Sequence, residues 1–153
     1  MLMLKTAKIG KGCLNGPGGG IKKGETEKSA AMRELSEESG VVTFLEYLKK
    51  VAVVDFHNLM ENGDDFVCRV HYFFCRKWFG VPESRPEENM INPTWFSHWA
   101  VPYKLMMPAD GDFVPLLLKE ENTDCVLEAS AYMGCNQTIK LKPTEMRWVL
   151  RSD

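Results

Sequence analysis

The stretch that decides the fold is residues 19–41, GGIKKGETEKSAAMRELSEESGV. A glycine turn opens it, and Glu34, Glu37 and Glu38 then follow the i, i+3, i+4 spacing that puts side chains on one face of a helix. Neighbouring carboxylates raise each other's proton affinity unless a cation lies among them. Hard oxygen ligands favour Mg²⁺, Mn²⁺ or Ca²⁺ over zinc or copper, and such a metal on few protein ligands usually meets a phosphate. The stretch therefore predicts a divalent-metal site that handles phosphate.

The residues around the acids predict where this helix begins and ends. Thr26 is suited to the N-cap, and Gly40 to the position just past the C-terminus. The loop 16–20 is rich in glycine, which lets a backbone approach a ligand or metal closely. The apolar face of the helix comprises Ala31, Met32 and Leu35. Taken alone, an acidic helix behind a flexible loop also fits a solvated surface helix.

The complete string resembles the Nudix box, G-x5-E-x7-R-E-U-x-E-E-x-G-U, where U is a bulky aliphatic residue. Its fixed positions are filled by Gly19, Glu25, Arg33, Glu34, Leu35, Glu37, Glu38, Gly40 and Val41. A full match by chance is negligible at background residue usage. The resemblance implies an α+β fold, a Nudix α/β/α sandwich with a mixed sheet. It also implies Mg²⁺, with Mn²⁺ as an alternative, on Glu34, Glu37, Glu38 and the Gly18 carbonyl oxygen.

Length and composition fit one globular enzyme domain over residues 1–153. Hydrophobic residues make up 44% of the chain and charged residues 26%, both ordinary values. The net charge of −2 argues against a general nucleic-acid binder. Six lysines crowd the first 28 residues: Lys5, Lys8, Lys11, Lys22, Lys23 and Lys28. They are either solvated side chains or a positive rim that attracts polyphosphate.

The cysteines indicate a reducing compartment. Their number, 5, is odd and they show no C-x2-C pairing, so we expect free thiols and a cytoplasmic protein. Cys68 and Cys75 lie in apolar stretches and are predicted to be core residues. No signal peptide and no apolar span of 18 residues is recognised, so no membrane partner is expected.

We expect a monomer or a weak homodimer that acts on a small nucleotide.

Apolar patterning predicts the remaining elements. Strands are expected over 51–57 and 66–78, with a turn over 58–65. Residues 81–93 hold three prolines and predict a loop, and Trp95 is expected to begin a short buried segment. A second helix is predicted over 112–120. The chain is expected to close with a hairpin of residues 125–132 and 137–150.

A resemblance to the MutT-type members of the Nudix family extends over nearly the whole chain. It includes a lead-in at 14–19 and motifs at 95–96, 101–104, 107–110, 115–118 and 140–150. It implies hydrolysis of oxidised purine nucleoside triphosphates, such as 8-oxo-dGTP, to the monophosphate and pyrophosphate. Such an enzyme sanitises the nucleotide pool and so prevents DNA damage.

Four residues are expected to bind the substrate. From the resemblance, Asn15 and Asp110 occupy positions that read the base edge, and Phe56 matches an aromatic pocket residue. Lys5, a member of the lysine-rich rim, is the fourth. An asparagine offers donors and an acceptor and can bond a purine edge bidentately. The local alternatives are a turn at Asn15, loop stabilisation or helix capping at Asp110, and a core position for Phe56.

Three positions depart from the MutT-type pattern. Ala109 replaces the first of two base-reading aspartates, and Met107 replaces a tryptophan that walls the pocket. Met90 stands where an additional metal-binding glutamate is found, and Glu87 or Glu88 could substitute for it. The family also has a strand before the one expected at residues 1–5. No residues here correspond to that strand, and truncation and a misassigned start are both open.

The expected phosphoryl substitution depends on the acidic residues of the box. Phosphoryl substitution needs positioning, charge neutralisation and an in-line nucleophile. Glu34 or Glu38 would accept the proton of the attacking water, and Arg33 would orient the acids. Glu25 would stabilise the junction of loop and helix. The alternatives are a Nudix hydrolase of another nucleoside diphosphate derivative and a non-catalytic nucleotide-binding Nudix module.

Overall fold

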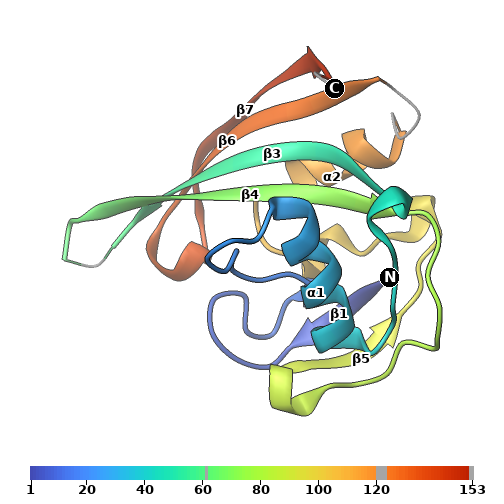
Figure 1. Ribbon diagram of the computed structural model, residues 1–153. Helices are drawn as coiled ribbons and strands as arrows, with labels where there is room; N and C mark the ends of the chain where they lie inside the picture. Colours follow the sequence, from blue (N-terminus) through green and yellow to red (C-terminus); the bar gives the residue numbers. More distant parts are fainter. Residues whose placement is uncertain (61, 120–123, 152–153) are drawn as a thin grey trace. The chain divides into compact units, whose positions relative to one another are not determined.

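A computed structural model describes residues 1–60, 62–119 and 124–151 of the chain (Figure 1). Two compact units are distinguished by their internal contacts. The first unit contains Met1–Lys50 and Phe73–Val101, and the second contains Val51–Tyr72 and the chain from Pro102 onward. Within the described residues, no helix is both long and apolar enough to cross a membrane.

The first unit is built on a three-stranded antiparallel sheet. Its strand order is β2 (Leu14–Asn15), β1 (Leu2–Lys5) and β5 (Met90–Thr94). Met3 and Met90 are almost fully buried and form the apolar centre of this sheet. Helix α1 (Glu27–Ser39) packs beside β5 (Figure 1). Three short 3-10 helices complete the unit: η1 (Leu45–Tyr47), η2 (Pro86–Glu88) and η3 (His98–Ala100).

Both predicted ends of helix α1 are confirmed. Thr26 is the N-cap, and its side chain accepts from the Ser29 backbone N–H while the Ser29 hydroxyl accepts from the Thr26 backbone N–H. Gly40 ends the helix with φ 76°, a left-handed conformation that favours glycine. A Cβ on Gly40 would lie 2.7 Å from Arg85 Nη2 and 3.0 Å from Glu83 Oε1. Glycine is therefore required at this position for space as well as for conformation.

The segment after α1 is anchored to residues 77–83. Ser39 is buried, and its carbonyl oxygen accepts from the Glu83 N–H at 3.0 Å. Val42 forms a bridge with Phe79, and the Thr43 hydroxyl donates to the Lys77 carbonyl oxygen at 2.6 Å. These bonds fix the C-terminal end of α1, which carries Glu37 and Glu38.

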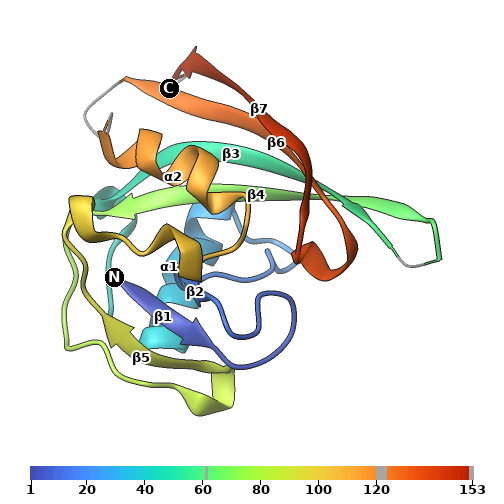
Figure 2. The same cartoon turned by 180° about the vertical axis from the view of Figure 1, so that it is seen from behind.

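The second unit is built on a four-stranded mixed sheet. Its order is β4 (Asp65–Cys75), β3 (Leu48–Leu59), β6 (Cys125–Met133) and β7 (Lys140–Leu150), with β3 beginning and β4 ending in the first unit. Strands β3 and β6 are parallel, whereas β6 and β7 are antiparallel. Helix α2 (Asp110–Lys119) lies along one face of this sheet (Figure 2). The 3-10 helices η4 (Tyr103–Leu105) and η5 (Cys135–Gln137) belong to the connections.

The core of the second unit follows from alternation along the strands. Every second residue of β6 faces α2, and these buried residues are Leu127, Ala129, Ala131 and Met133. Phe113 of α2 is fully buried and meets Phe56 of β3 and Tyr72 of β4 edge to face. The aromatic contacts hold α2 against the sheet.

Several predicted elements are confirmed. The α+β class with a mixed sheet is correct, as are the strand over 51–57 and the antiparallel pair that follows residue 124. The predicted strand 66–78 ends at Cys75. The predicted turn 58–65 is shorter, because β3 continues through Leu59, and Glu61 lies outside the described residues.

Other predictions were wrong. Strand β5 begins inside the predicted loop 81–93 and ends at Thr94, and β2 was not predicted at all. Trp95 follows β5 and is 55% exposed, so it does not begin a buried segment. Helix α2 begins at Asp110 rather than at 112, and its predicted end at Glu120 lies outside the described residues. Cys68 is exposed, because the first half of β4 is exposed on both of its faces.

Candidate functional site

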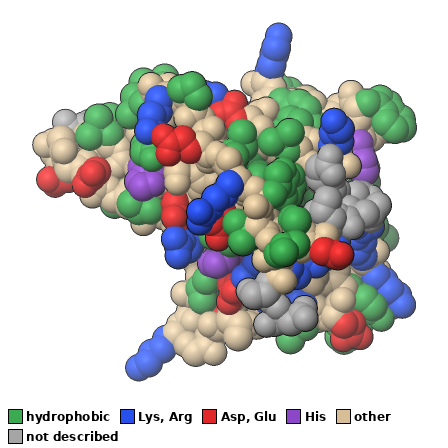
Figure 3. All heavy atoms as spheres, turned by 90° about the horizontal axis from the view of Figure 1, so that it is seen from above, with side chains coloured by type: hydrophobic (Ala, Val, Ile, Leu, Met, Phe, Trp, Pro, Cys, Tyr) green, Lys and Arg blue, Asp and Glu red, His purple; other side chains and the backbone are tan. Residues whose placement is uncertain are grey.

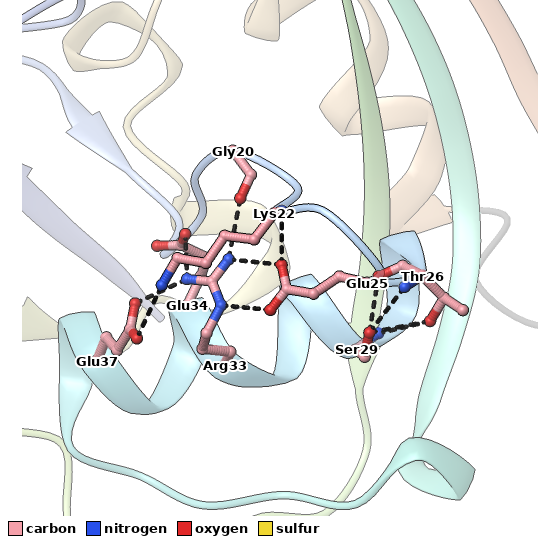
Figure 4. A network of polar contacts seen from close by, with 8 residues as sticks. All are labelled: Gly20, Lys22, Glu25, Thr26, Ser29, Arg33, Glu34 and Glu37. Carbon is pink, nitrogen blue, oxygen red and sulfur yellow. Dashed lines mark hydrogen bonds and ion pairs between the residues drawn. The ribbon is translucent and has the colours of Figure 1, made fainter.

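The centre of the predicted site is the Arg33 side chain on α1 (Figure 4). Its Nε and Nη2 donate to the two carboxylate oxygens of Glu25 at 2.6 and 2.9 Å. This paired geometry is the strong form of a charge-assisted hydrogen bond. It holds the pKa of Glu25 down at about 2. Glu25 also accepts from the Lys22 backbone N–H at 2.8 Å, so it joins the loop to the helix.

The remaining Arg33 hydrogens bond two further acids and the loop. Nη1 donates to Glu34 Oε1 at 2.6 Å and to Glu37 Oε2 at 2.7 Å, and Nη2 also donates to the Gly20 carbonyl oxygen at 2.9 Å (Figure 4). A guanidinium has five N–H groups, and these contacts occupy all of them. In this arrangement Arg33 orients the acids and has no N–H left for a substrate.

The glycine loop approaches Glu34 closely. A Cβ on Gly19 would lie 2.5 Å from both Cδ and Oε1 of Glu34. No real Cβ contact is that short, so only glycine allows the loop to lie against this carboxylate. The sequence predicted that this loop approaches a ligand or metal closely, and the approach that the structure shows is to Glu34. The approach to a ligand or metal stays a prediction.

Glu38 is the buried member of the acid cluster. It is 8% exposed, and its Oε2 accepts from the Gly18 backbone N–H at 2.7 Å. Burial raises its pKa, and the negative charges of Glu34 and Glu88 act in the same direction. The Gly18 hydrogen bond and the positive charge of Lys5 oppose that rise. Glu38 is thus a carboxylate held near other acids and poorly solvated.

Comparison with known proteins identifies the family. The model described as the NUDIX domain matches residues 1–117. The chain belongs to the Nudix hydrolase family. The acids around Arg33 and the loop before them are therefore its Nudix box.

Two curated relatives carry the same name, oxidized purine nucleoside triphosphate hydrolase. The one from Mus musculus is 33% identical over 121 residues, and the one from Danio rerio is 32% identical over 121 residues. Each alignment covers 79% of this chain and 72% of the relative.

Two solved structures share the fold. A Mutator MutT protein from Bacillus halodurans superposes with a TM-score of 0.68 at 21% identity, covering 95% of this chain and 88% of its own. A MutT NUDIX hydrolase from Burkholderia pseudomallei gives a TM-score of 0.59 at 23% identity, covering 80% of this chain and 86% of its own. They confirm the predicted Nudix fold.

Nudix hydrolases generally use divalent metal ions. Within residues 1–60, 62–119 and 124–151, no three His, Cys, Asp or Glu side chains converge as a ready metal cluster. Arg33 donates a hydrogen bond to one oxygen each of Glu34 and Glu37 and leaves the other oxygen of each carboxylate without a bond from Arg33. The carboxylate oxygens nevertheless fit a hard cation such as Mg²⁺. Glu38 is buried and close enough to Glu34 and Glu88 for their negative charges to raise its pKa, and a cation among these acids would offset that repulsion.

The two candidate substrate residues of the first unit lie in different settings. Asn15 ends β2, and its Oδ1 accepts from the Gly16 N–H at 3.0 Å, which is the local turn considered as an alternative. This bond leaves the amide hydrogens of Asn15 to address a ligand, so bidentate recognition would require the turn to open. Lys5 ends β1, is half-buried, and exerts its charge on Glu38.

The two candidate residues of the second unit are both buried. Asp110 is 4% exposed at the start of α2, and its Oδ2 accepts from the Met107 N–H at 3.2 Å. Burial raises the pKa of Asp110 to about 6. Phe56 is 5% exposed and packs on Phe113, which is the core position rather than an open pocket wall. Ala109 and Met107 are also buried.

Glu88 was named from the sequence, with Glu87, as a substitute for the glutamate missing at Met90. Met90 is buried in β5 and has no ligand chemistry there, whereas Glu88 of η2 is close enough to affect Glu38. The contribution of Lys22 to the box was not assigned from the sequence. Lys22 was assigned only to a lysine-rich rim, yet its Nζ lies 3.6 Å from Glu37 Oε1 and its backbone holds Glu25. The signal for Lys22 was its place three residues before Glu25.

Proposed function

We propose that this Nudix protein is a Mg²⁺-dependent pyrophosphohydrolase of oxidised purine nucleoside triphosphates such as 8-oxo-dGTP. It would break the bond between the α- and β-phosphates and release the monophosphate and pyrophosphate. The names of the two curated relatives support this substrate class. The five free thiols suit a cytoplasmic location, where the nucleotide pool is accessible.

The observation that carries the catalytic proposal is that the box is complete and folded as one network. Arg33 holds Glu25, Glu34 and Glu37, while the loop contacts Glu38 through Gly18. Phosphoryl transfer depends mainly on such positioning and on electrostatic stabilisation. A non-catalytic binding module would have no need of every acid in this arrangement.

Metal binding is assigned to Glu34, Glu37, Glu38 and the Gly18 carbonyl oxygen. A bound divalent ion supplies charge neutralisation at the phosphates and lowers the pKa of a water molecule. Of the candidate bases, Glu38 has the raised pKa and bonds only the Gly18 N–H among the hydrogen bonds observed in the described residues, whereas Glu34 is tied to Arg33. We therefore assign the proton of the attacking water to Glu38. Arg33 keeps Glu34 and Glu37 oriented.

Base recognition is assigned to Asn15 and Asp110. Asn15 offers the amide hydrogens that the Gly16 turn leaves available, and Asp110 offers a carboxyl group that is partly protonated near neutral pH. Lys5 would attract the polyphosphate. With Ala109 and Met107 in place of a second acid and an aromatic wall, we expect a narrower preference for oxidised over ordinary purines.

The test is pyrophosphate release from a nucleotide panel with Mg²⁺. The panel contains 8-oxo-dGTP, 2-oxo-dATP, dGTP, ADP-ribose and a dinucleoside polyphosphate, each measured as kcat/KM. We expect the oxidised triphosphates to be the best substrates. Equal values for oxidised and ordinary purines, or a clear preference for ADP-ribose, would assign the protein to another Nudix activity. Binding without turnover of any member would indicate a nucleotide-binding module.

A further inference from the structure

Asn58, near the end of β3, is a buried polar residue with incomplete hydrogen bonding. It is 3% exposed, and its Nδ2 donates to the Phe56 carbonyl oxygen at 2.8 Å. Its Oδ1 is shielded from solvent and accepts no hydrogen bond from any residue that the structure describes. A buried acceptor without a donor destabilises the folded protein, so its presence calls for an explanation.

The orientation of this amide is fixed by its partner. The Phe56 carbonyl oxygen can only accept, so the amide nitrogen must face it and Oδ1 must point away. Asn58 therefore presents an acceptor, and it cannot rotate to present a donor without losing the bond to Phe56.

Asn58 faces the layer between the sheet and α2. Val54, Phe56 and Asn58 alternate along β3 and so share one face of the sheet. Helix α2 lies over one face of the sheet (Figure 2). It is the face that carries Phe56, because Phe56 meets Phe113 of α2 with ring centroids 6.5 Å apart. In the parallel pair, Asn58 lies opposite Met133, the last residue of β6. The acceptor thus lies at the carboxyl end of two parallel strands, where ligands bind in many α/β sheets.

The beginning of α2 lies at the same end of this unit. The Asp112 carboxylate accepts from the Thr144 hydroxyl at 2.6 Å. Thr144 belongs to the part of β7 that pairs with the last residues of β6, where Ser130 lies opposite Glu145 and Tyr132 opposite Lys142. Asp110 lies two residues before Asp112, is buried, and is close enough to Tyr72 for its charge to raise the pKa of that hydroxyl.

Asp110 is a second buried polar group at this layer, and its burial disfavours the ionised carboxylate. Burial raises the pKa of Asp110 to about 6, and it raises the pKa of the Tyr72 hydroxyl well above its ordinary value. Polar groups that destabilise a fold while surrounded by apolar side chains are typical of a prebuilt recognition site. Unbranched methionines lie beside both groups, Met133 opposite Asn58 and Met107 bonded to Asp110. Methionine repacks easily, so a base can displace these side chains.

We propose that Asn58 is a base-recognition residue whose Oδ1 accepts a hydrogen bond from the N7–H of an 8-oxopurine. This inference rests on the proposed function. An 8-oxopurine carries a hydrogen on N7, whereas an ordinary purine carries a lone pair there. A fixed acceptor therefore attracts the oxidised base and repels the ordinary one. A site that matches a substrate N–H in this way discriminates far more strongly than an apolar slot.

The experiment is the Asn58→Leu variant, which keeps the side-chain size and removes the acceptor. Its kcat/KM is measured for 8-oxo-dGTP, dGTP and 8-bromo-dGTP, the last having a C8 substituent but no N7–H. We expect a loss of about 5- to 100-fold for 8-oxo-dGTP alone, the range for one unpaired buried hydrogen bond. The values for dGTP and 8-bromo-dGTP should not fall, and relief of the repulsion between Oδ1 and the N7 lone pair should leave them equal to the wild-type values or higher. The matched control is Asn62→Leu, in the exposed turn before β4.

The outcomes separate this inference from the proposed function. If the wild-type protein prefers 8-oxo-dGTP and Asn58→Leu leaves that preference unchanged, Asn58 does not read the base. An equal loss for all three nucleotides assigns Asn58 a structural role and also overturns the inference. If the wild-type protein shows no preference for 8-oxo-dGTP, the proposed function fails and this inference fails with it. Thermal unfolding provides the folding check. Asn58→Leu removes both the unpaired acceptor and the hydrogen bond to the Phe56 carbonyl oxygen, two effects of opposite sign, so the variant should unfold in one cooperative transition within about 5 °C of the wild type.

Discussion

At the scale of single residues, Glu38 combines burial with proximity to other acids. Glu38→Gln keeps the shape and the bond from the Gly18 N–H but removes the charge. We predict a loss of at least about 100-fold in kcat, the size of losing an acid–base or electrostatic group. Stability at pH 7 should rise, because the raised pKa shows that ionised Glu38 destabilises the fold. Pyrophosphate release and thermal unfolding measure the two effects.

Glu46→Gln is the control for this prediction, since Glu46 is an exposed acid of η1 in the same unit. It should change neither kcat nor the unfolding temperature. Near wild-type turnover in Glu38→Gln would remove Glu38 from the catalytic assignment.

The sequence predicted single residues well where the local pattern determines their contacts. The box spacing placed the acids around Arg33, and the caps at Thr26 and Gly40 follow from local geometry. It predicted poorly where neighbours distant in sequence decide the contact. The sequence left Glu87 and Glu88 as alternatives, and only the folded structure shows that Glu88 affects Glu38. The exposure of Cys68 depends on how β4 is placed, and no local signal reports this.

At the scale of elements, the loop before α1 is held against Glu34. Gly19→Ala would place a methyl group 2.5 Å from the Glu34 carboxylate, so loop or acid must shift. Displacing a catalytic element by about 1 Å can cost about 100-fold in rate. We predict a loss of that order in kcat/KM with the fold retained. Gly20→Ala is the matched control, because its Cβ would meet nothing within 4 Å. Similar activity in both variants would show that the approach of Gly19 to Glu34 is unimportant.

Arg33 joins this loop to α1, and lysine cannot replace it. A lysine ammonium is a point charge without the planar fork that bonds Glu25 through two parallel hydrogen bonds. We predict that Arg33→Lys lowers kcat/KM by about 10- to 100-fold, because Glu34 and Glu37 lose their orientation. Arg69→Lys is the control, since Arg69 makes the same paired contact with Asp55 outside the box. Equal activity of the two variants would contradict the orienting role of Arg33.

Elements were predicted where the pattern is long and regular. The alternating apolar residues of β3 and the caps of α1 were sufficient to predict these two elements. Strand β5 was missed because Met90–Thr94 is short and contains Pro93 and the left-handed Asn92, both of which favour a loop. Its pairing with β1, far away in the sequence, outweighs those preferences. Helix α2 begins at Asp110 rather than at 112 because local hydrogen bonds close the turn before it: the Asp110 side chain accepts from the Met107 N–H, and the Asp110 N–H donates to the Met107 carbonyl oxygen.

At the scale of the whole molecule, the balance of acids determines how stability depends on pH. Acidic and basic side chains are interspersed on the face shown in Figure 3. Four paired carboxylates have lowered pKa values, namely Glu25, Asp55, Asp112 and Glu145. Their stabilisation is complete above the pKa of the unfolded chain, near 4, and is lost as the pH falls toward 2. The two buried acids with raised pKa values, Glu38 and Asp110, act in the opposite direction. Stability should therefore be greatest at about pH 4–5, the window between these two effects.

Asp110 provides the sharpest test of that balance. Its pKa rises from 3.8 in the unfolded chain to about 6 in the fold, so the folded protein binds its proton more tightly. Stability must then fall as the pH rises from 4 to 6 and stay low above 6, by up to about 3 kcal/mol. Asp110→Asn keeps an acceptor for the Met107 N–H and removes this dependence. We predict that the variant and the wild type unfold at similar temperatures at pH 3.5. Above pH 6 the variant should unfold about 6–10 °C higher than the wild type.

Asp65→Asn, at an exposed position of β4, is the control and should follow the wild type throughout. Parallel curves for Asp110→Asn and wild type between pH 4 and 7 would show that Asp110 ionises normally in the fold, and the role of its protonated carboxyl in base recognition would have to be abandoned.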